Sequence, residues 1–155
     1  MLFEQASAWI SSVKPLNIKM SIIVEKNFNK MVAKALTEVS PVSPGETLLR
    51  MQQDSHTLVV DVRDPVDIAA TGMIPGAINV PLGSLTYKAD NEVPEEWRDL
   101  QLQDRSRPVI MTCLHGSLGA LGGKLLKDMG FKDVSFIKGG VQAWQDAGFP
   151  TEKVA

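Results

Sequence analysis

The stretch Pro108-Val-Ile-Met-Thr-Cys113-Leu-His-Gly-Ser-Leu-Gly119 predicts a strand, then a tight loop, then the start of a helix. Residues 109–112 are apolar and partly β-branched, which is typical of a buried strand. Gly116 and Gly119 allow the loop to curl tightly, and apolar residues at helical spacing continue to residue 129. The single cysteine of the chain therefore stands between the end of a strand and the start of a helix.

This position favours a chemical role for Cys113. At a helix N-terminus, unpaired N–H groups and the positive end of the helix dipole attract an anion, either a thiolate or a sulfur oxyanion beside it. The thiolate is the nucleophilic form of cysteine. A lone cysteine is more often inert packing, but here a strand end, a glycine loop and a helix start coincide, which favours a reactive thiol.

Composition and charge narrow the possible classes of protein. The 155 residues suit one domain with a short appendage, and 44% hydrophobic with 22% charged residues is typical of a globular protein. The formal net charge of −2 argues against a nucleic-acid partner or an anionic membrane surface. One cysteine cannot form an internal disulfide, which favours a cytoplasmic location. No secretory signal and no transmembrane segment of roughly twenty apolar residues is recognisable.

The first 38 residues are expected to form a helical extension before a domain that covers residues 39–155. Residues 2–13 and 25–38 each carry apolar side chains at helical spacing, and the second segment has a basic edge made by Lys26, Lys30 and Lys34. We interpret both helices as packing on the domain. A homodimer contact, docking of a partner and a peripheral membrane contact are the alternatives. Met20 is an alternative start of translation.

Alternating strand and helix patterns over the remainder predict an α/β fold with a parallel sheet and helices on both faces. Residues 40–46 are expected to separate the extension from the domain and to start a helix, capped by Ser43, at Pro44. Asp64 is expected to cap a brief helix in the same way. Strands are predicted over residues 57–62, 77–80 and 133–137, a surface loop with one turn near Trp97 over 84–107, and a closing helix over 141–147.

Four motifs stand in order along this pattern: Asp61-Val-Arg63, Ile74-Pro-Gly-Ala77-Ile-Asn-Val-Pro81, Cys113-Leu-His-Gly116-Ser, and Gly139-Gly140 followed by Ala143-Trp144 and Gly148-Phe-Pro150. Together they resemble the single-domain rhodaneses, the family of thiosulfate sulfurtransferases, over roughly residues 40–150. The resemblance implies a rhodanese-like parallel β-sheet with helices on both faces, preceded here by the N-terminal helical extension.

The resemblance also implies a reaction. Cys113 would take a sulfane sulfur from a small donor, thiosulfate or a persulfide, hold it as a persulfide and pass it to a thiol or cyanide acceptor. The chemistry would need no metal and no cofactor. The loop that would bind the substrate consists of Leu114, His115, Gly116, Ser117, Leu118 and Gly119. A non-catalytic or sulfur-relay interaction module is the alternative.

One position departs from the family pattern. Many members carry arginine where Leu118 stands, and that arginine helps to bind the thiosulfate dianion. A charged hydrogen bond contributes roughly 1.5 to 3 kcal/mol, so its loss would weaken thiosulfate binding about tenfold or more. Cysteine phosphatases and arsenate reductases share the strand–loop–helix arrangement, but they need arginine six positions after the cysteine, where Gly119 stands.

The roles of three polar residues near Cys113 are open. His115 either assists the thiolate or points to solvent. Ser117 either binds an oxyanion or caps the helix that follows. Arg63 is a candidate substrate contact, because the end of its strand is close to the pocket, and an ion pair with Asp67 is the structural alternative.

Overall fold

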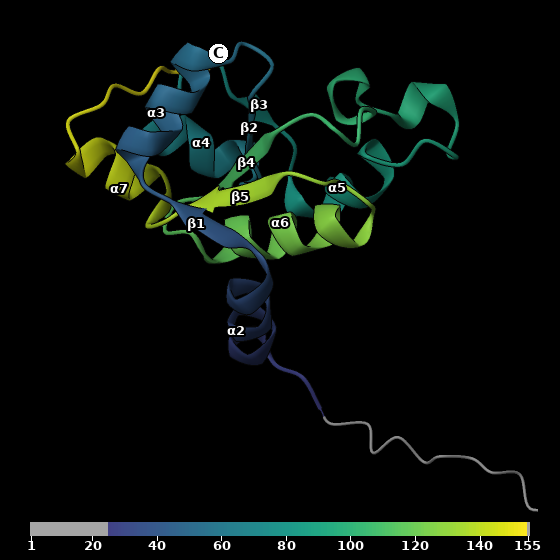
Figure 1. The fold of residues 1–155 in the computed structure, drawn as a ribbon. Coiled ribbons are helices and arrows are strands. Elements are labelled where there is room, and N and C mark those ends of the chain that lie inside the picture. The colour runs from purple at the N-terminus through teal and green to yellow at the C-terminus, as the bar shows by residue number, and fades with distance from the viewer. Residues whose placement is uncertain (1–24, 155) are drawn as a thin grey trace, which may run out of the picture.

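The computed structural model describes residues 25–154 and has the helices and strands of an α/β fold (Figure 1). In chain order they are α2 (Phe28–Glu38), β1 (Ser40–Val42), α3 (Pro44–Gln53), β2 (Leu58–Asp61), α4 (Pro65–Thr71), β3 (Ile78–Asn79), α5 (Leu82–Lys88), the 3-10 turns η1 (Glu95–Trp97) and η2 (Leu100–Leu102), β4 (Val109–Thr112), α6 (Ser117–Asp128), β5 (Val134–Ile137) and α7 (Gly140–Asp146).

The five strands form one parallel sheet in the order β1-β5-β4-β2-β3. Strand β4 is central, and Asp61 of β2 lies beside Thr112 of β4, so these two strands end at the same edge. The sequence interpretation missed β1, because residues 40–42 were expected to be a separator. A three-residue edge strand tolerates Pro41, which has no N–H to offer a further neighbour.

Helices cover both faces of the sheet, as expected, and two apolar clusters form the core. Helices α3 and α7 cover one face, where the buried residues include Val59, Ile110 and Trp144. Helices α2, α5 and α6 cover the other face, where they include Val60, Met111 and Leu126. Because successive residues of a strand point to opposite faces, β2 and β4 supply both clusters and are buried throughout.

The segment from residue 84 to residue 107 is more ordered than the expected loop. It contains the end of α5 and two 3-10 turns, of which η1 is the expected turn near Trp97. Leu85 and Ala89, four residues apart, and Leu102 are fully buried in the cluster under α6. The few apolar residues of this segment are separated by charged ones, so no helical periodicity was recognisable in the sequence. Packing against α6 stabilises α5.

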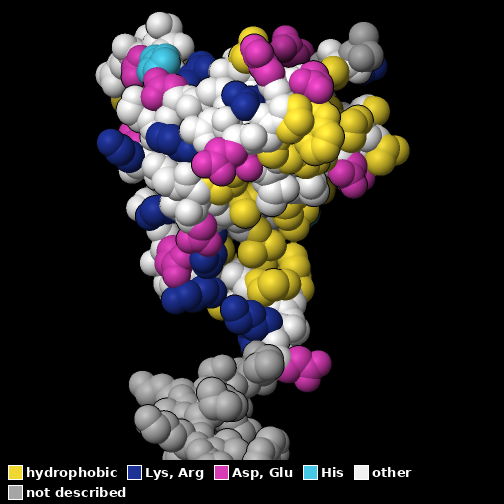
Figure 2. Space-filling model, turned by 90° about the vertical axis from the view of Figure 1, so that its right-hand side faces the viewer, with side chains coloured by type: hydrophobic (Ala, Val, Ile, Leu, Met, Phe, Trp, Pro, Cys, Tyr) yellow, Lys and Arg dark blue, Asp and Glu magenta, His cyan; other side chains and the backbone are white. Residues whose placement is uncertain are grey.

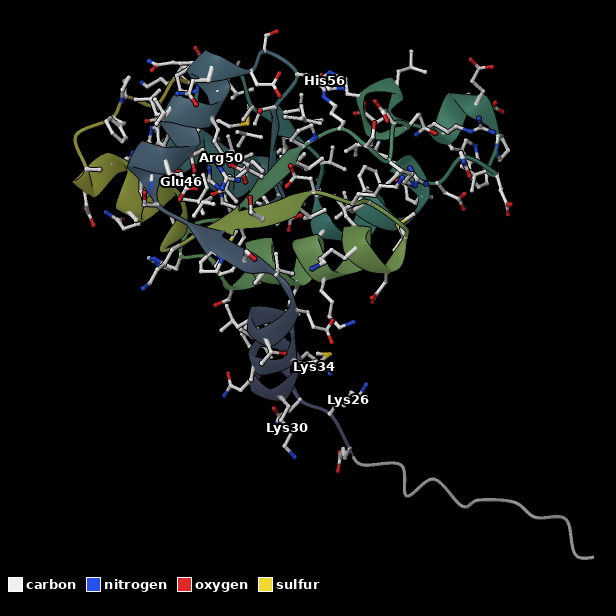
Figure 3. All side chains as sticks on the ribbon, viewed as in Figure 1. Lys26, Lys30, Lys34, Glu46, Arg50 and His56 are labelled. Atoms are coloured by element: carbon white, nitrogen blue, oxygen red, sulfur yellow. The ribbon has the colours of Figure 1, made fainter. Side chains whose placement is uncertain are left out.

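Two helix starts were expected to be capped by a side chain, and one of them is. The Ser43 hydroxyl accepts a hydrogen bond from the Glu46 N–H at 3.0 Å, while Glu46 forms an ion pair with Arg50 along α3 (Figure 3). Asp64 occupies the N-cap of α4 before Pro65, as expected, but its side chain makes no capping hydrogen bond, so only the position of the cap is confirmed. The fixed backbone of Pro65 in the first turn supports this helix start instead.

Ser43→Ala is expected to lower the free energy of unfolding by about 1 kcal/mol, because it removes an acceptor for an otherwise unpaired N–H of the first turn. Urea denaturation of the two proteins measures the difference. Ser40→Ala, at an exposed serine of the edge strand, is the matched control and is expected to change little. Equal effects at Ser40 and Ser43 would contradict the capping role.

Helix α2 is the first helix of the described residues. It confirms the helix expected over residues 25–38, and it packs against α6. Ala35 is fully buried, whereas Phe28, Met31 and Leu36 are exposed. The basic edge is made by Lys26, just before α2, and by Lys30 and Lys34 of α2 (Figure 3). In the lower part of the described surface, Figure 2 shows basic side chains next to hydrophobic ones. The helix expected over residues 2–13 lies outside the described residues.

An ion pair between Glu38 and Lys124 also joins α2 to α6, beside the pair that Glu38 forms with Lys34 within α2. Glu38 lies 3.0 Å from Lys34 and 3.2 Å from Lys124, and hydrogen bonds from these two ammonium groups hold the pKa of Glu38 below its ordinary value.

In the part of the chain that the structure describes, no helix has both the length and the apolar character needed to cross a bilayer.

Candidate active site

Cys113 lies just beyond the carboxyl end of β4, where the sequence interpretation placed it. The residue is only 3% exposed, yet its side chain lines a pocket of about 420 Å³. The other lining residues come from the loop after β4, the start of α6, the end of β2 and α4: Leu114, His115, Ser117, Leu118, Arg63, Asp67, Ala70 and Thr71. The thiol therefore belongs to the core and still faces a cavity.

The loop after Cys113 folds back so that its backbone contacts the sulfur. The N–H of Gly116 donates to the Cys113 Sγ at 3.1 Å. Gly116 is the N-cap of α6 and has φ +108, a value that favours glycine. Since Gly116 is the N-cap and Ser117 is the first residue of α6, the capping alternative for Ser117 is wrong, and binding of an oxyanion by Ser117 stays a prediction.

Backbone N–H groups of α7 donate hydrogen bonds to the carbonyl groups at the start of the same loop. The N–H of Val141 donates to the Cys113 oxygen at 2.8 Å, and the N–H of Gln142 donates to the Leu114 oxygen at 3.0 Å. Gly140 permits this contact, because a Cβ there would collide with the Cys113 oxygen and lie 2.6 Å from the Leu114 carbonyl carbon. The first turn of α7 thus holds the loop in the arrangement in which the Gly116 N–H donates to the sulfur.

Arg63 lines the pocket, but its guanidinium is hydrogen-bonded to other groups of the protein. Its guanidinium pairs with Asp61, where Nη2 lies 2.7 Å from Oδ2, and also donates to Thr71 Oγ1 and to the Gly72 carbonyl. The ion pair expected with Asp67 was wrong, because the partner is the fully buried Asp61. Among the described residues, Asp67 forms no ion pair. A contact between Arg63 and a substrate stays a prediction.

The remaining predicted residues divide between the pocket and its support. His115 is exposed at the rim, and Leu118 is partly buried with one side on the core. Gly119 does not line the pocket: a Cβ there would lie 3.3 Å from the Thr112 backbone, so this glycine lets α6 approach β4. No sequence motif marks the wall of the pocket that α4 forms with Asp67, Ala70 and Thr71. The wall was predictable only from topology, because α4 follows β2, the neighbour of β4.

A model of the family described as "Rhodanese-like domain" matches residues 44–147, which include every residue that lines the Cys113 pocket. This chain belongs to the rhodanese-like family. The match confirms the resemblance drawn from the motifs around Arg63, Ala77, Cys113 and Gly140.

Several named relatives of this rhodanese-like chain are sulfurtransferases. It is 30% identical over 109 residues to the thiosulfate sulfurtransferase GlpE of Pseudomonas putida, covering 70% of this chain and 87% of GlpE. It is 36% identical over 92 residues to the adenylyltransferase and sulfurtransferase UBA4 of Meyerozyma guilliermondii, covering 59% of this chain and only 21% of UBA4. These relatives support sulfur transfer as the general activity of the family member described here.

Solved structures agree with the fold. The polysulfide-sulfur transferase homodimer of Wolinella succinogenes has a TM-score of 0.64 at 25% identity and covers 83% of this chain and 88% of its own. A protein of unknown function from Rhodopseudomonas palustris, described as a possible tyrosine phosphatase, has a TM-score of 0.76 at 30% identity and covers 83% and 96%. In this rhodanese-like chain, Gly119 stands where the arginine of cysteine phosphatases is needed, against the backbone of β4.

Proposed function

We propose that this rhodanese-like protein is a sulfurtransferase that carries a sulfane sulfur on Cys113, from thiosulfate or a persulfide donor to a thiol or cyanide acceptor. The observation that carries the proposal is the Gly116 N–H, which lies 3.1 Å from the Cys113 Sγ beside an open pocket. A donor fixed at this point stabilises negative charge on the thiolate and on the persulfide without moving during the reaction.

In the proposed reaction the Cys113 thiolate attacks the outer sulfur of the donor. With thiosulfate, the bond between the two donor sulfurs breaks, sulfite leaves with the bonding electrons, and Cys113 holds the transferred sulfur as a persulfide. A cyanide or thiolate acceptor then attacks that outer sulfur, and the Cys113 thiolate is restored. Because the carrier must stay reduced between cycles, we propose a reducing compartment, the cytoplasm.

A sulfur-relay or interaction module is the second candidate function. It is favoured by the surroundings of Arg63, whose charge is neutralised by Asp61, and by the apolar side chain of Leu118. These features leave the pocket without an available cation that could pair with a small dianionic substrate. In this alternative Cys113 would accept sulfur from one protein and release it only to another.

A single-turnover experiment separates the two functions. The protein is loaded with thiosulfate or an organic persulfide, the donor is removed by desalting, and cyanide is added. We expect thiocyanate in an amount close to the molar amount of protein, because each chain has one cysteine. Protein carried through the same steps without donor is the control. Loading without release to cyanide or to small thiols would favour the relay, and no loading from either donor would contradict both.

A further inference from the structure

We infer that the Cys113 pocket selects sulfane donors that carry an apolar organic group over the small dianion thiosulfate. The inference rests on the proposed function, since it names the donor class for the same sulfur-carrying site. Three features of the pocket carry it: its charges, its apolar lining and its size.

The charges of the pocket do not favour a dianion. Among the described residues, Arg63 is the only arginine or lysine in its lining, and its side chain is 3% exposed and paired with the fully buried Asp61. Its Nη1 atom also donates to Thr71 and its Nη2 atom to the Gly72 carbonyl, so most of its N–H donors are already bonded within the protein. Asp67, whose side chain is exposed, adds a negative charge to the lining of the pocket. An incoming dianion would thus meet a carboxylate that repels it and a guanidinium already neutralised.

The surface beside the sulfur is apolar. Ala70 of α4, Leu114 of the loop and Leu118 of α6 line the pocket together with Cys113. Burying a charged oxygen against such side chains costs free energy unless it finds a hydrogen bond, whereas burying an organic group there is favourable. The Gly116 N–H contacts the Cys113 sulfur itself, so it supports the charge of the carrier rather than a distant sulfonate group.

The size of the pocket also exceeds what a tetrahedral ion fills. Its volume of about 420 Å³ falls in the range of sites that enclose organic ligands. An organic group would cover Leu114 and Leu118 while the terminal sulfur of the donor reaches Cys113.

The transfer step from such a donor balances without an additional reactant. The Cys113 thiolate attacks the terminal sulfur of R–S–SH, the bond between the two donor sulfurs breaks, and R–S⁻ leaves while Cys113 keeps the S–SH group. One S–S bond forms and one breaks, and the negative charge passes to the leaving thiolate, which then takes a proton from water. The organic group R remains in the apolar part of the pocket during this exchange.

The test compares kcat/KM for benzyl persulfide, methyl persulfide and thiosulfate, with sulfur on Cys113 followed by intact mass. We expect benzyl persulfide to be used about tenfold or more better than methyl persulfide, mainly through a lower KM, because the reacting sulfurs are the same and only the buried group differs. Thiosulfate is expected to be the poorest of the three donors. Equal values for the two persulfides, or a preference for thiosulfate, would overturn the inference.

Leu118→Arg tests the charge argument on the same donors. A cation at this position faces the pocket, so thiosulfate use is expected to rise about tenfold or more, while the advantage of benzyl over methyl persulfide falls. Leu100→Arg, at a leucine that is 77% exposed and outside the pocket, adds the same charge and is expected to change neither. An unchanged thiosulfate rate in folded Leu118→Arg would count against the inference.

The outcomes also separate this inference from the proposed function. If thiosulfate loads Cys113 as well as the organic donors do, sulfur transfer stands and the donor selection is wrong. If none of the three donors adds sulfur to Cys113, the proposed function itself is wrong.

Discussion

Cys113→Ser is expected to abolish sulfur transfer, with turnover falling at least about a thousandfold, to the rate without enzyme. Serine retains the shape of the side chain, and its oxygen can accept the hydrogen bond that the Gly116 N–H now gives to sulfur. It cannot form a persulfide, because a persulfide needs a sulfur atom on the carrier residue and serine offers only oxygen. Thiocyanate formation in the steady state measures the loss, and a urea transition near that of the wild type shows that the fold survives.

A second substitution shows whether the place of the thiol matters as much as its presence. Ser106→Cys in the Cys113→Ser protein puts a thiol at an exposed position outside the pocket. Its turnover is expected to stay near that of Cys113→Ser, because a thiol at residue 106 would lack the Gly116 N–H and the pocket that adjoin Cys113. Full turnover in either variant would show that sulfur transfer does not depend on Cys113 in its loop.

Gly140→Ala is expected to lower the free energy of unfolding by about 2 to 5 kcal/mol and to slow sulfur loading in the molecules that remain folded. Its φ is +64, and the added methyl group would collide with the Cys113 carbonyl oxygen. The loop must then move away from α7, which breaks the bonds from Val141 and Gln142 that fix its carbonyl groups. Urea denaturation and single-turnover loading at a temperature where the protein is folded measure the two effects.

Gly148→Ala is the matched control for Gly140→Ala. Gly148 follows the other end of α7 and has φ +84, but nothing lies within 4 Å of a Cβ there. Only the backbone strain is added, so we expect a loss of about 1 kcal/mol and unchanged sulfur loading. If the two alanines cost the same, or if loading is unaffected in Gly140→Ala, the support of the loop by α7 is not what positions the sulfur.

The reactive centre was predictable from the sequence because its signals are local. An apolar strand, a cysteine and two glycines stand within twelve residues, and together they define the strand end, the loop and the helix start around Cys113. Gly116 has a positive φ in the tight loop, as its expected role there requires, and its N–H contacts the sulfur, whereas Gly119 lies inside α6 and not in the loop. The parallel sheet was predictable in the same way, from the apolar runs of β2, β4 and β5.

What failed depends on tertiary packing, which local patterns do not report. For Arg63 a substrate contact and an ion pair with Asp67 were considered, but the residue is buried with Asp61, two residues earlier, and bonds to Thr71 and Gly72. Strand β1 is three residues long and exists because β5 offers it an edge, which no local pattern reports. The role of Gly140 was likewise hidden, because the backbone that it touches lies more than twenty residues earlier in the sequence.

The central claim is that Cys113 itself receives the sulfur. Peptide mapping by mass spectrometry after incubation with thiosulfate and with benzyl persulfide tests this most directly, because the chain contains a single thiol. We predict one added sulfur atom on the peptide that contains Cys113, removed by cyanide and absent from Cys113→Ser. A folded protein whose Cys113 stays unmodified with both donors, or whose added sulfur lies on another residue, would contradict the account.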